Sequence, residues 1–105
     1  MKVKAKDKRI KALDQVPATT ADEDLNVVGL QPGDAALIRS IVTELRAFPN
    51  VAAAGLAHEE WDLHHWKPRK AASPWSISVS GQWRLLFEYD KTTHDITGLR
   101  LAQPH

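Results

Sequence analysis

The fold is decided by residues 74–90, which read PWSISVSGQWRLLFEYD. In the first half of this stretch, from Trp75 onward, large apolar side chains alternate with serines, the period of a strand with one buried face. Gly81 follows, and we expect it to supply the positive φ of a tight turn. A second β-rich run, from Trp83 to Tyr89, predicts the partner strand. The pattern therefore indicates an antiparallel β-hairpin.

Further strands are predicted on both sides of this hairpin. Residues 61–66 predict a short strand before it, and residues 95–101 predict a last strand after a turn at residues 90–93. At the N-terminus, lysines alternate with Val3 and Ala5, which indicates another half-buried strand.

Two helices are predicted before the hairpin. Asp7 is placed to cap a short first helix that buries Ile10 and Leu13 and that Pro17 ends. A longer helix is predicted from Pro32 to about Ala47, because apolar residues recur there at helical spacing and proline suits a first turn. The core face of this longer helix is expected to consist of Leu37, Ile38, Ile41, Val42, Leu45 and Phe48.

The order of these elements predicts an α+β fold, with an N-terminal strand and two helices packed on a 3–4 stranded antiparallel sheet. Residues 17–31 are expected to form a loop with at most one helical turn, and the alanine-rich residues 51–57 a connection. A chain of 105 residues is long enough for one domain and too short for two, so residues 1–105 are expected to form a single domain.

The composition excludes several classes of protein. The chain is 43% hydrophobic and 26% charged, as in an ordinary soluble globular protein and unlike a disordered one. It contains no cysteine, which excludes disulfides, thiolate-bound zinc, iron–sulfur clusters and a thiol nucleophile. No apolar run approaches the roughly 20 residues of a membrane span, and the first residues are too charged for a signal peptide. We therefore expect a cytoplasmic protein without membrane contact.

Charge is segregated along the chain. Residues 1–11 carry six basic side chains and one acidic, residues 12–62 carry two basic and nine acidic, and residues 63–105 carry six basic and three acidic. If the basic ends meet in the fold, they form a face suited to a polyanion. The alternative is that the charges solvate separate faces. The acidic run Asp22 to Asp24 is likewise either a docking site for a basic partner or a solvated loop.

Residues 63–90 read LHHWKPRKAASPWSISVSGQWRLLFEYD and resemble the HigB branch of the RelE-like toxins, the plasmid maintenance killer proteins. The family pattern runs Leu-His-x-Leu-Lys-Gly, a short loop, Trp-Ser-Ile/Val-Ser-Val, Asn-Gly-Asn and Trp-Arg-Ile-x-Phe. The matching positions are Leu63, His64, Lys67, Trp75, Ser76, Ile77, Ser78, Val79, Gly81, Trp83, Arg84 and Phe87.

The resemblance implies the compact RelE-like fold and a toxin of a type II toxin–antitoxin system, an endoribonuclease that enters the ribosomal A site and cuts mRNA. It also implies a cognate helix-turn-helix antitoxin, similar to HigA. The chain departs from the family pattern at Pro68, where the family has glycine. It also departs in the tail, because the family closes on Asp-Tyr-His and residues 96–105 contain no tyrosine.

Metal-independent cleavage of RNA by 2′-OH attack needs cations around the phosphorane, a base and an acid. Four residues are candidates for the cations: Lys67, Arg69, Lys70 and Arg84. Arg84 lies on a predicted strand, where a guanidinium is held at fixed geometry, so we expect it to stabilise the transition state. Arg69 and Lys70 lie on a predicted loop and suit the RNA backbone. The alternative for Arg84 is an ion pair with Glu88 or Glu44.

Histidine suits the proton transfers because its ordinary pKa lies near neutrality. His64 matches the family histidine and is the candidate base. Lys67 is an alternative base if nearby cations lower its pKa, and otherwise a solvated loop cation. His105 is the candidate acid or a frayed end. His94, expected in a turn, and Trp66, expected to be exposed, are candidate RNA-binding residues.

The histidines show no ligand spacing for a metal, so neither a metal nor another cofactor is expected. The leading hypothesis is a ribosome-dependent mRNA endoribonuclease. One alternative is a catalytically silent RelE-like protein that binds antitoxin or ribosome. The other is a basic nucleic-acid-binding domain unrelated to toxins, whose affinity would fall steeply with salt and need no ribosome.

Overall fold

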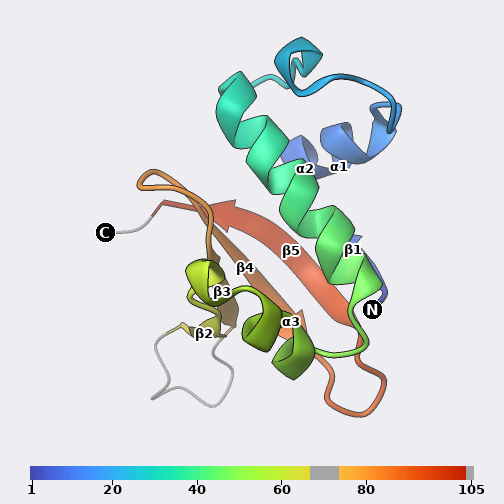
Figure 1. Cartoon of the computed structure of the whole chain (residues 1–105), viewed down its shortest axis with the longest axis vertical. Helices are drawn as coiled ribbons and strands as arrows, with labels where there is room; N and C mark the ends of the chain where they lie inside the picture. The colour runs from blue at the N-terminus through green and yellow to red at the C-terminus, as the bar shows by residue number, and fades with distance from the viewer. Residues whose placement is uncertain (67–73, 104–105) are drawn as a thin grey trace.

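The structure is a computed structural model that describes residues 1–66 and 74–103 (Figure 1). The first elements along the chain are β1 (Val3–Ala5), α1 (Lys8–Gln15), the 3-10 turn η1 (Asp22–Asp24), α2 (Pro32–Ala47) and α3 (Val51–Ala57). They are followed by the 3-10 turn η2 (Glu59–Trp61), β2 (His64–His65), β3 (Trp75–Ser78), β4 (Arg84–Tyr89) and β5 (Ile96–Ala102). One strand is therefore followed by all the helices and then by the other strands, an order that is typical of an α+β chain.

The strands of the described part of the chain form one five-stranded sheet in the order β1-β5-β4-β3-β2. Strands β2 to β5 pair antiparallel with their neighbours, whereas β1 pairs with β5 in parallel. The α+β class is confirmed, but the expectation of a 3–4 stranded antiparallel sheet is wrong. The N-terminal strand does not lie apart from the sheet: it extends the sheet beyond β5, whose outer hydrogen-bonding groups would otherwise be unpaired.

Only one face of this sheet packs against the helices, which lie in front of it in Figure 1. Alternate strand residues are fully buried: Ile77, Leu85, Phe87 and Leu99. They belong to the same apolar core as Ile38 and Leu45 of α2. Because strand side chains alternate, the residues between them project from the other side. We call this side the open face, and its residues include Arg84, Leu86, Glu88 and Arg100. No helix of the described residues covers it.

The helices differ from their predicted form in two places. Helix α2 has the predicted bounds, but Leu37 is 41% exposed and lies outside the core face to which it was assigned. Residues 51–57 form helix α3 and not a connection. Alanine favours a helix, and the Asn50 side chain caps this one by accepting a hydrogen bond from the backbone N–H of Ala53 at 2.8 Å.

The predicted turn at Gly81 is present, but its mechanism is different. The glycines with positive φ among the described residues are Gly29 and Gly98, so the expectation for Gly81 is wrong. The Ser80 hydroxyl stabilises the turn instead, since it accepts from the backbone N–H groups of Gln82 at 3.2 Å and Trp83 at 3.3 Å.

The strand predicted over residues 61–66 is mostly replaced by η2 and a left-handed residue. Asp62 has a φ of 48°, which breaks an extended run and leaves only His64 and His65 as β2. His58 fixes this segment: its ring stacks on Trp61 at 4.1 Å and bonds Glu60 at 2.6 Å and Glu44 of α2 at 3.0 Å. The hydrogen bond to Glu60, aided by Glu44, raises the pKa of His58 above its ordinary value.

The carboxylate of Asp7 joins the two ends of the described chain. It caps α1 by accepting from the backbone N–H of Arg9 at 2.9 Å, and it accepts from the backbone N–H of Leu101 on β5 at 3.1 Å. The Arg9 guanidinium pairs with the same carboxylate at 2.9 Å and lies 4.8 Å from the ring centre of Trp83. Burial acts to raise the pKa of Asp7, but these hydrogen bonds and the Arg9 charge together lower it.

We expect Leu45→Ala to lower the free energy of unfolding by about 2–5 kcal/mol, because Leu45 is fully buried and its loss leaves a cavity. The matched control is Leu37→Ala on the same helix, which should cost less than about 1 kcal/mol because the side chain is partly exposed. Urea denaturation followed by circular dichroism measures both. Equal losses would contradict the placement of the two leucines.

We expect Asp7→Asn to destabilise the protein by about 1–3 kcal/mol near pH 7, because Arg9 and Leu101 lose a charged acceptor. The folded pKa of Asp7 lies below its ordinary value of 3.8, so its stabilising effect is present above that value and is lost as the pH falls through the lower folded pKa. Urea midpoints of wild type and variant should therefore converge below about pH 4. A difference independent of pH would contradict this account.

Candidate functional site

Arg84, the first residue of β4, is held on the open face by three neighbours. Its Nη1 donates a hydrogen bond to the Ser76 hydroxyl at 2.9 Å, and its Nη2 lies 3.7 Å from a carboxylate oxygen of Asp62. The guanidinium carbon lies 4.8 Å from the centre of the Trp66 ring, within the range of a cation–π contact. Since the side chain is only 18% exposed, the guanidinium has a fixed position.

His64 lies beside this arginine on the neighbouring part of the sheet. It is paired with Ser76 in the β2–β3 ladder, so Ser76 lies between the histidine and the arginine. Its Nδ1 is 2.6 Å from the backbone carbonyl of Asp62, and a carbonyl can only accept. We infer that Nδ1 carries the proton in the neutral ring, which leaves the Nε2 lone pair to act as a base.

Other basic side chains extend the open face toward β1. Val3 and Ala5 of β1 pack against the core, so Lys4 between them projects to the opposite side. Arg100 on β5 lies opposite Leu86 of β4, but its Nη1 is bonded to both carboxylate oxygens of Glu88, at 3.1 and 3.0 Å. Strand β1, with Lys4, therefore lies on the same sheet as the strands of the basic second half of the chain.

The structure brings three of the predicted site residues together: His64, Trp66 and Arg84. Trp66 is half-buried and not fully exposed as expected, and its ring contacts Arg84. His94 lies elsewhere, in the β4–β5 turn at the other end of β4, where Nδ1 is 2.6 Å from the Tyr89 hydroxyl. The remaining predicted residues lie outside the described residues: Lys67, Arg69, Lys70 and His105.

The ion pairs considered as alternatives for Arg84 are both wrong. Glu88 pairs with Arg100, and Glu44 pairs with His58. The actual neighbours, Ser76 and Asp62, were missed by the sequence analysis. The contact of Ser76 with Arg84 could have been predicted, because pairing across the hairpin places the two residues diagonally opposite each other. The position of Asp62 depends on a left-handed backbone conformation that no local sequence motif predicts.

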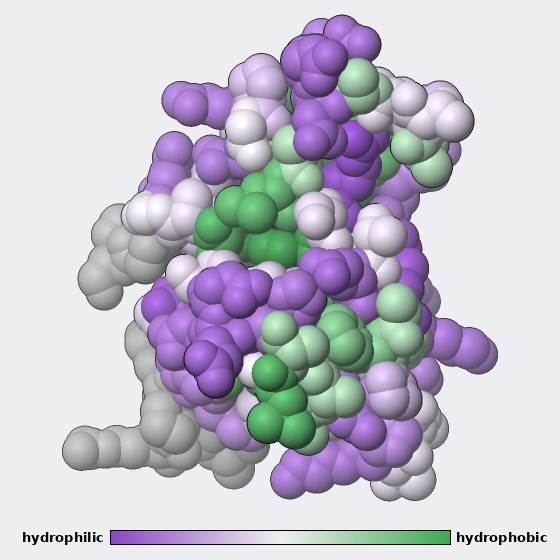
Figure 2. All heavy atoms as spheres, viewed as in Figure 1, coloured by the Kyte–Doolittle hydropathy of each residue, from purple (hydrophilic) through white to green (hydrophobic). Residues whose placement is uncertain are grey.

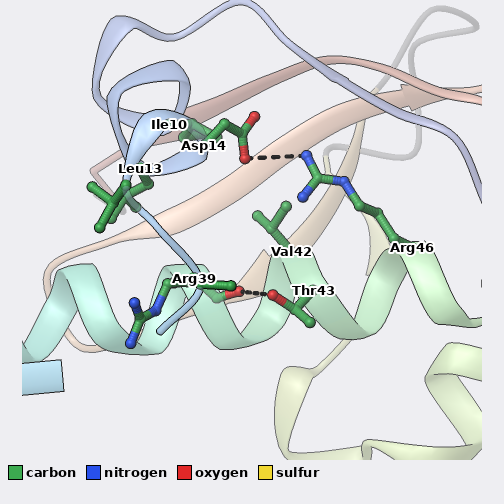
Figure 3. A pocket seen from close by; sticks show the side chains of 9 residues that line it. Ile10, Leu13, Asp14, Arg39, Val42, Thr43 and Arg46 are labelled. Carbon is green, nitrogen blue, oxygen red and sulfur yellow. Dashed lines mark hydrogen bonds and ion pairs between the residues drawn. The ribbon is translucent and has the colours of Figure 1, made fainter. Parts of the chain in front are cut away.

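A separate hollow of about 160 Å³ lies between α1 and α2, on the helical side of the molecule (Figure 3). Its arginines already have carboxylate partners: Arg46 pairs with Asp14 at 3.1 Å, and Arg39 pairs with Asp22 at 2.6 Å. The acidic run at residues 22–24 is therefore partly neutralised within the chain. The Arg39 Nη1 is buried and has no hydrogen-bond partner among the described residues. We assign no chemistry to this hollow.

In the described ranges 1–66 and 74–103, no group of three or more His, Asp or Glu side chains is placed to hold a metal ion. Among the same residues, no helix has the length and apolar character needed to span a bilayer.

Comparison with protein-family models finds no match to this chain. A search of curated proteins also finds no match. The resemblance to RelE-like toxins rests on the matched residues alone.

Ser76→Ala removes the acceptor of the Arg84 hydrogen bond from a fully buried position, so we expect a loss of about 0.5–1.5 kcal/mol in the free energy of unfolding. The control is Ser78→Ala, a half-buried serine of the same strand with no side-chain hydrogen bond to a described residue. Urea denaturation compares the two. A larger loss for Ser78→Ala would contradict the assigned role of Ser76.

Proposed function

We propose that this chain is the toxin of a type II toxin–antitoxin system, a HigB-like, ribosome-dependent mRNA endoribonuclease that works by metal-independent 2′-OH attack. The observation that carries the proposal is the Arg84 guanidinium, fixed on the open face by Ser76, Asp62 and Trp66. It supports the family resemblance because Ser76 and Arg84 are matched positions of the family pattern.

The proposed reaction needs one base and one cation from the described residues. The Nε2 of His64 takes the proton from the 2′-OH, whose oxygen attacks the adjacent phosphorus and forms a 2′,3′-cyclic phosphate. Arg84 stabilises the negative charge that develops on the non-bridging phosphate oxygens. The bond to the 5′-oxygen breaks, and an acid returns a proton to that oxygen. His105 is proposed for that step, and Lys67, Arg69 and Lys70 for binding the RNA backbone.

The partners follow from the same proposal. The substrate is mRNA on the ribosome, and Lys4 on the open face supplies further positive charge near a bound strand, whereas the charge of Arg100 is paired with Glu88. The inhibitor is a cognate helix-turn-helix antitoxin similar to HigA. The site of action is the cytoplasm, where ribosomes and mRNA meet.

One observation favours a second candidate function. The Asp62 carboxylate lies 3.7 Å from Arg84 and competes with a phosphate for the guanidinium. The second candidate is therefore a catalytically silent RelE-like protein that binds antitoxin or ribosome and leaves RNA intact.

We expect primer extension on a reporter mRNA in a reconstituted translation system to show cuts only when ribosomes are present. Arg84→Ala should reduce the cutting rate about 100-fold or more, because it removes a charge that acts in the transition state. Arg46→Ala is the matched control, because Arg46 also pairs with an aspartate but lies on the helical side, and it should stay within a few-fold of wild type. His64→Ala should slow cutting, because it removes the proposed base.

The other outcomes separate the alternatives. No cuts by a folded wild-type chain would establish the silent binding protein. Cuts without ribosomes, together with salt-sensitive binding to free RNA, would indicate a general nucleic-acid-binding nuclease and not a HigB-like toxin.

A further inference from the structure

Helix α3 has no charged or polar side chain, although one side of it faces solvent. It reads VAAAGLA, its buried residues are Val51 and Ala54, and Leu56 is 85% exposed. A helix that is apolar on all sides is normally covered on all sides. Figure 2 shows an apolar patch over this helix, separated by polar side chains from a second patch over α2. The exposed side of α3 therefore has the character of a contact surface.

A groove of about 700 Å³ adjoins this helix. Its walls come from α3 and from the ends of β3 and β4, and its largest side chains are Leu56, Leu63, Trp75 and Tyr89. Trp75 and Tyr89 are half-buried and meet edge to face at 6.3 Å, so their rings form a rigid apolar wall. The volume lies in the range of about 300–1,000 Å³ that holds a ligand or a few side chains of a partner.

The described lining of the groove carries a single positive charge. Among its described lining residues, Lys91 is the one charged side chain, and His94 and Asn50 are the other polar ones. The Tyr89 hydroxyl receives a hydrogen bond from the backbone N–H of Val51 at 3.4 Å, so its own proton is available for His94 Nδ1 at 2.6 Å. The neutral His94 ring then presents an N–H at Nε2. The lining therefore offers donors and the charge of Lys91, with no carboxylate among its described residues, although Asp90 precedes Lys91 in the same turn.

We propose that this groove binds an acidic, amphipathic peptide segment of another protein. Bulky apolar side chains of the segment pack on Leu56, Trp75 and Tyr89, and Asp or Glu side chains beside them contact Lys91 and His94. The proposal does not rest on nuclease activity, because the groove and Arg84 lie at opposite ends of β4.

Two other occupants fit the groove less well. A nucleic acid needs several phosphate-binding cations, and the described lining holds a single lysine among apolar walls. A second copy of this chain offers its own acidic run at residues 22–24 and Val28, which is 93% exposed. That contact would be head-to-tail and would produce rings or open chains of molecules.

The test uses the full-length chain and a phage-displayed library of random peptides about 16 residues long, depleted first on the Leu56→Asp variant. We expect enrichment of peptides that combine bulky apolar residues with Asp or Glu. Synthetic copies should bind Leu56→Asp about tenfold or more weakly than wild type, because the leucine no longer buries apolar area. Lys91→Glu should weaken binding several-fold and reduce its salt dependence.

The matched control is Val28→Asp, which also adds a charge at an exposed apolar residue but outside the groove, and it should leave peptide binding unchanged. Circular dichroism checks that each variant folds. If Leu56→Asp does not fold, Lys91→Glu still tests the proposal. The proposal is overturned if no peptide is enriched, or if the selected peptides lack acidic residues or bind all variants equally well. It is also overturned if labelled RNA binds the protein and this binding requires Leu56. It is also overturned if sedimentation shows oligomers that Leu56→Asp dissociates.

Discussion

The carboxylate of Asp7 binds groups from both ends of the described chain and so holds the start of α1 against β5. Asp7 caps α1 and accepts a hydrogen bond from the backbone of Leu101, which lies 94 residues further along. Without that acceptor, the backbone N–H of Leu101 would face a buried region unpaired, beside the short parallel strand β1. The hydrogen bonds from Arg9 and from the backbone of Leu101, more than the charge of Arg9, lower the pKa of this carboxyl despite its burial, so the Asp7–Arg9 pair is costly to break on one side.

This junction also determines where the candidate site lies. Arg9 contacts Asp7 on one side and the Trp83 ring on the other, so the residue directly before Arg84 is attached to the start of α1. From the other direction, the stacked pair of His58 and Trp61 fixes the chain that leads to Asp62 and His64. The open face therefore receives its candidate site residues from two segments that are both held against the rest of the fold, as the proposed catalysis would require.

Most of the fold was predictable because its signals are local. The hairpin, α1 with its Asp7 cap, and α2 follow from apolar period and from capping residues that act within a few positions. Two features were missed. The parallel pairing of β1 with β5 depends on contact between distant segments. The helix at 51–57 has local signals, its alanines and the Asn50 cap, which the prediction of a connection overlooked. In the candidate site, Arg84 and His64 were predictable from the family resemblance. Their neighbour Asp62 was not, since its left-handed conformation is imposed by the packing of the segment around it.

The two surfaces of β4 are separate enough to be used independently. Arg84 and Tyr89 are the first and last residues of the strand, which at about 3.3 Å per residue places them roughly 16 Å apart. They also project from different sides of the sheet, Arg84 on the open face and Tyr89 beside α3. A peptide in the groove would therefore leave the Arg84 guanidinium accessible, and substitutions in one surface should act additively with substitutions in the other. A partner that fills the groove and also blocks Arg84 would need a second contact on the open face. An inhibitor of the proposed nuclease would therefore differ from a protein that binds only in the groove by its number of contact regions, and not by affinity alone.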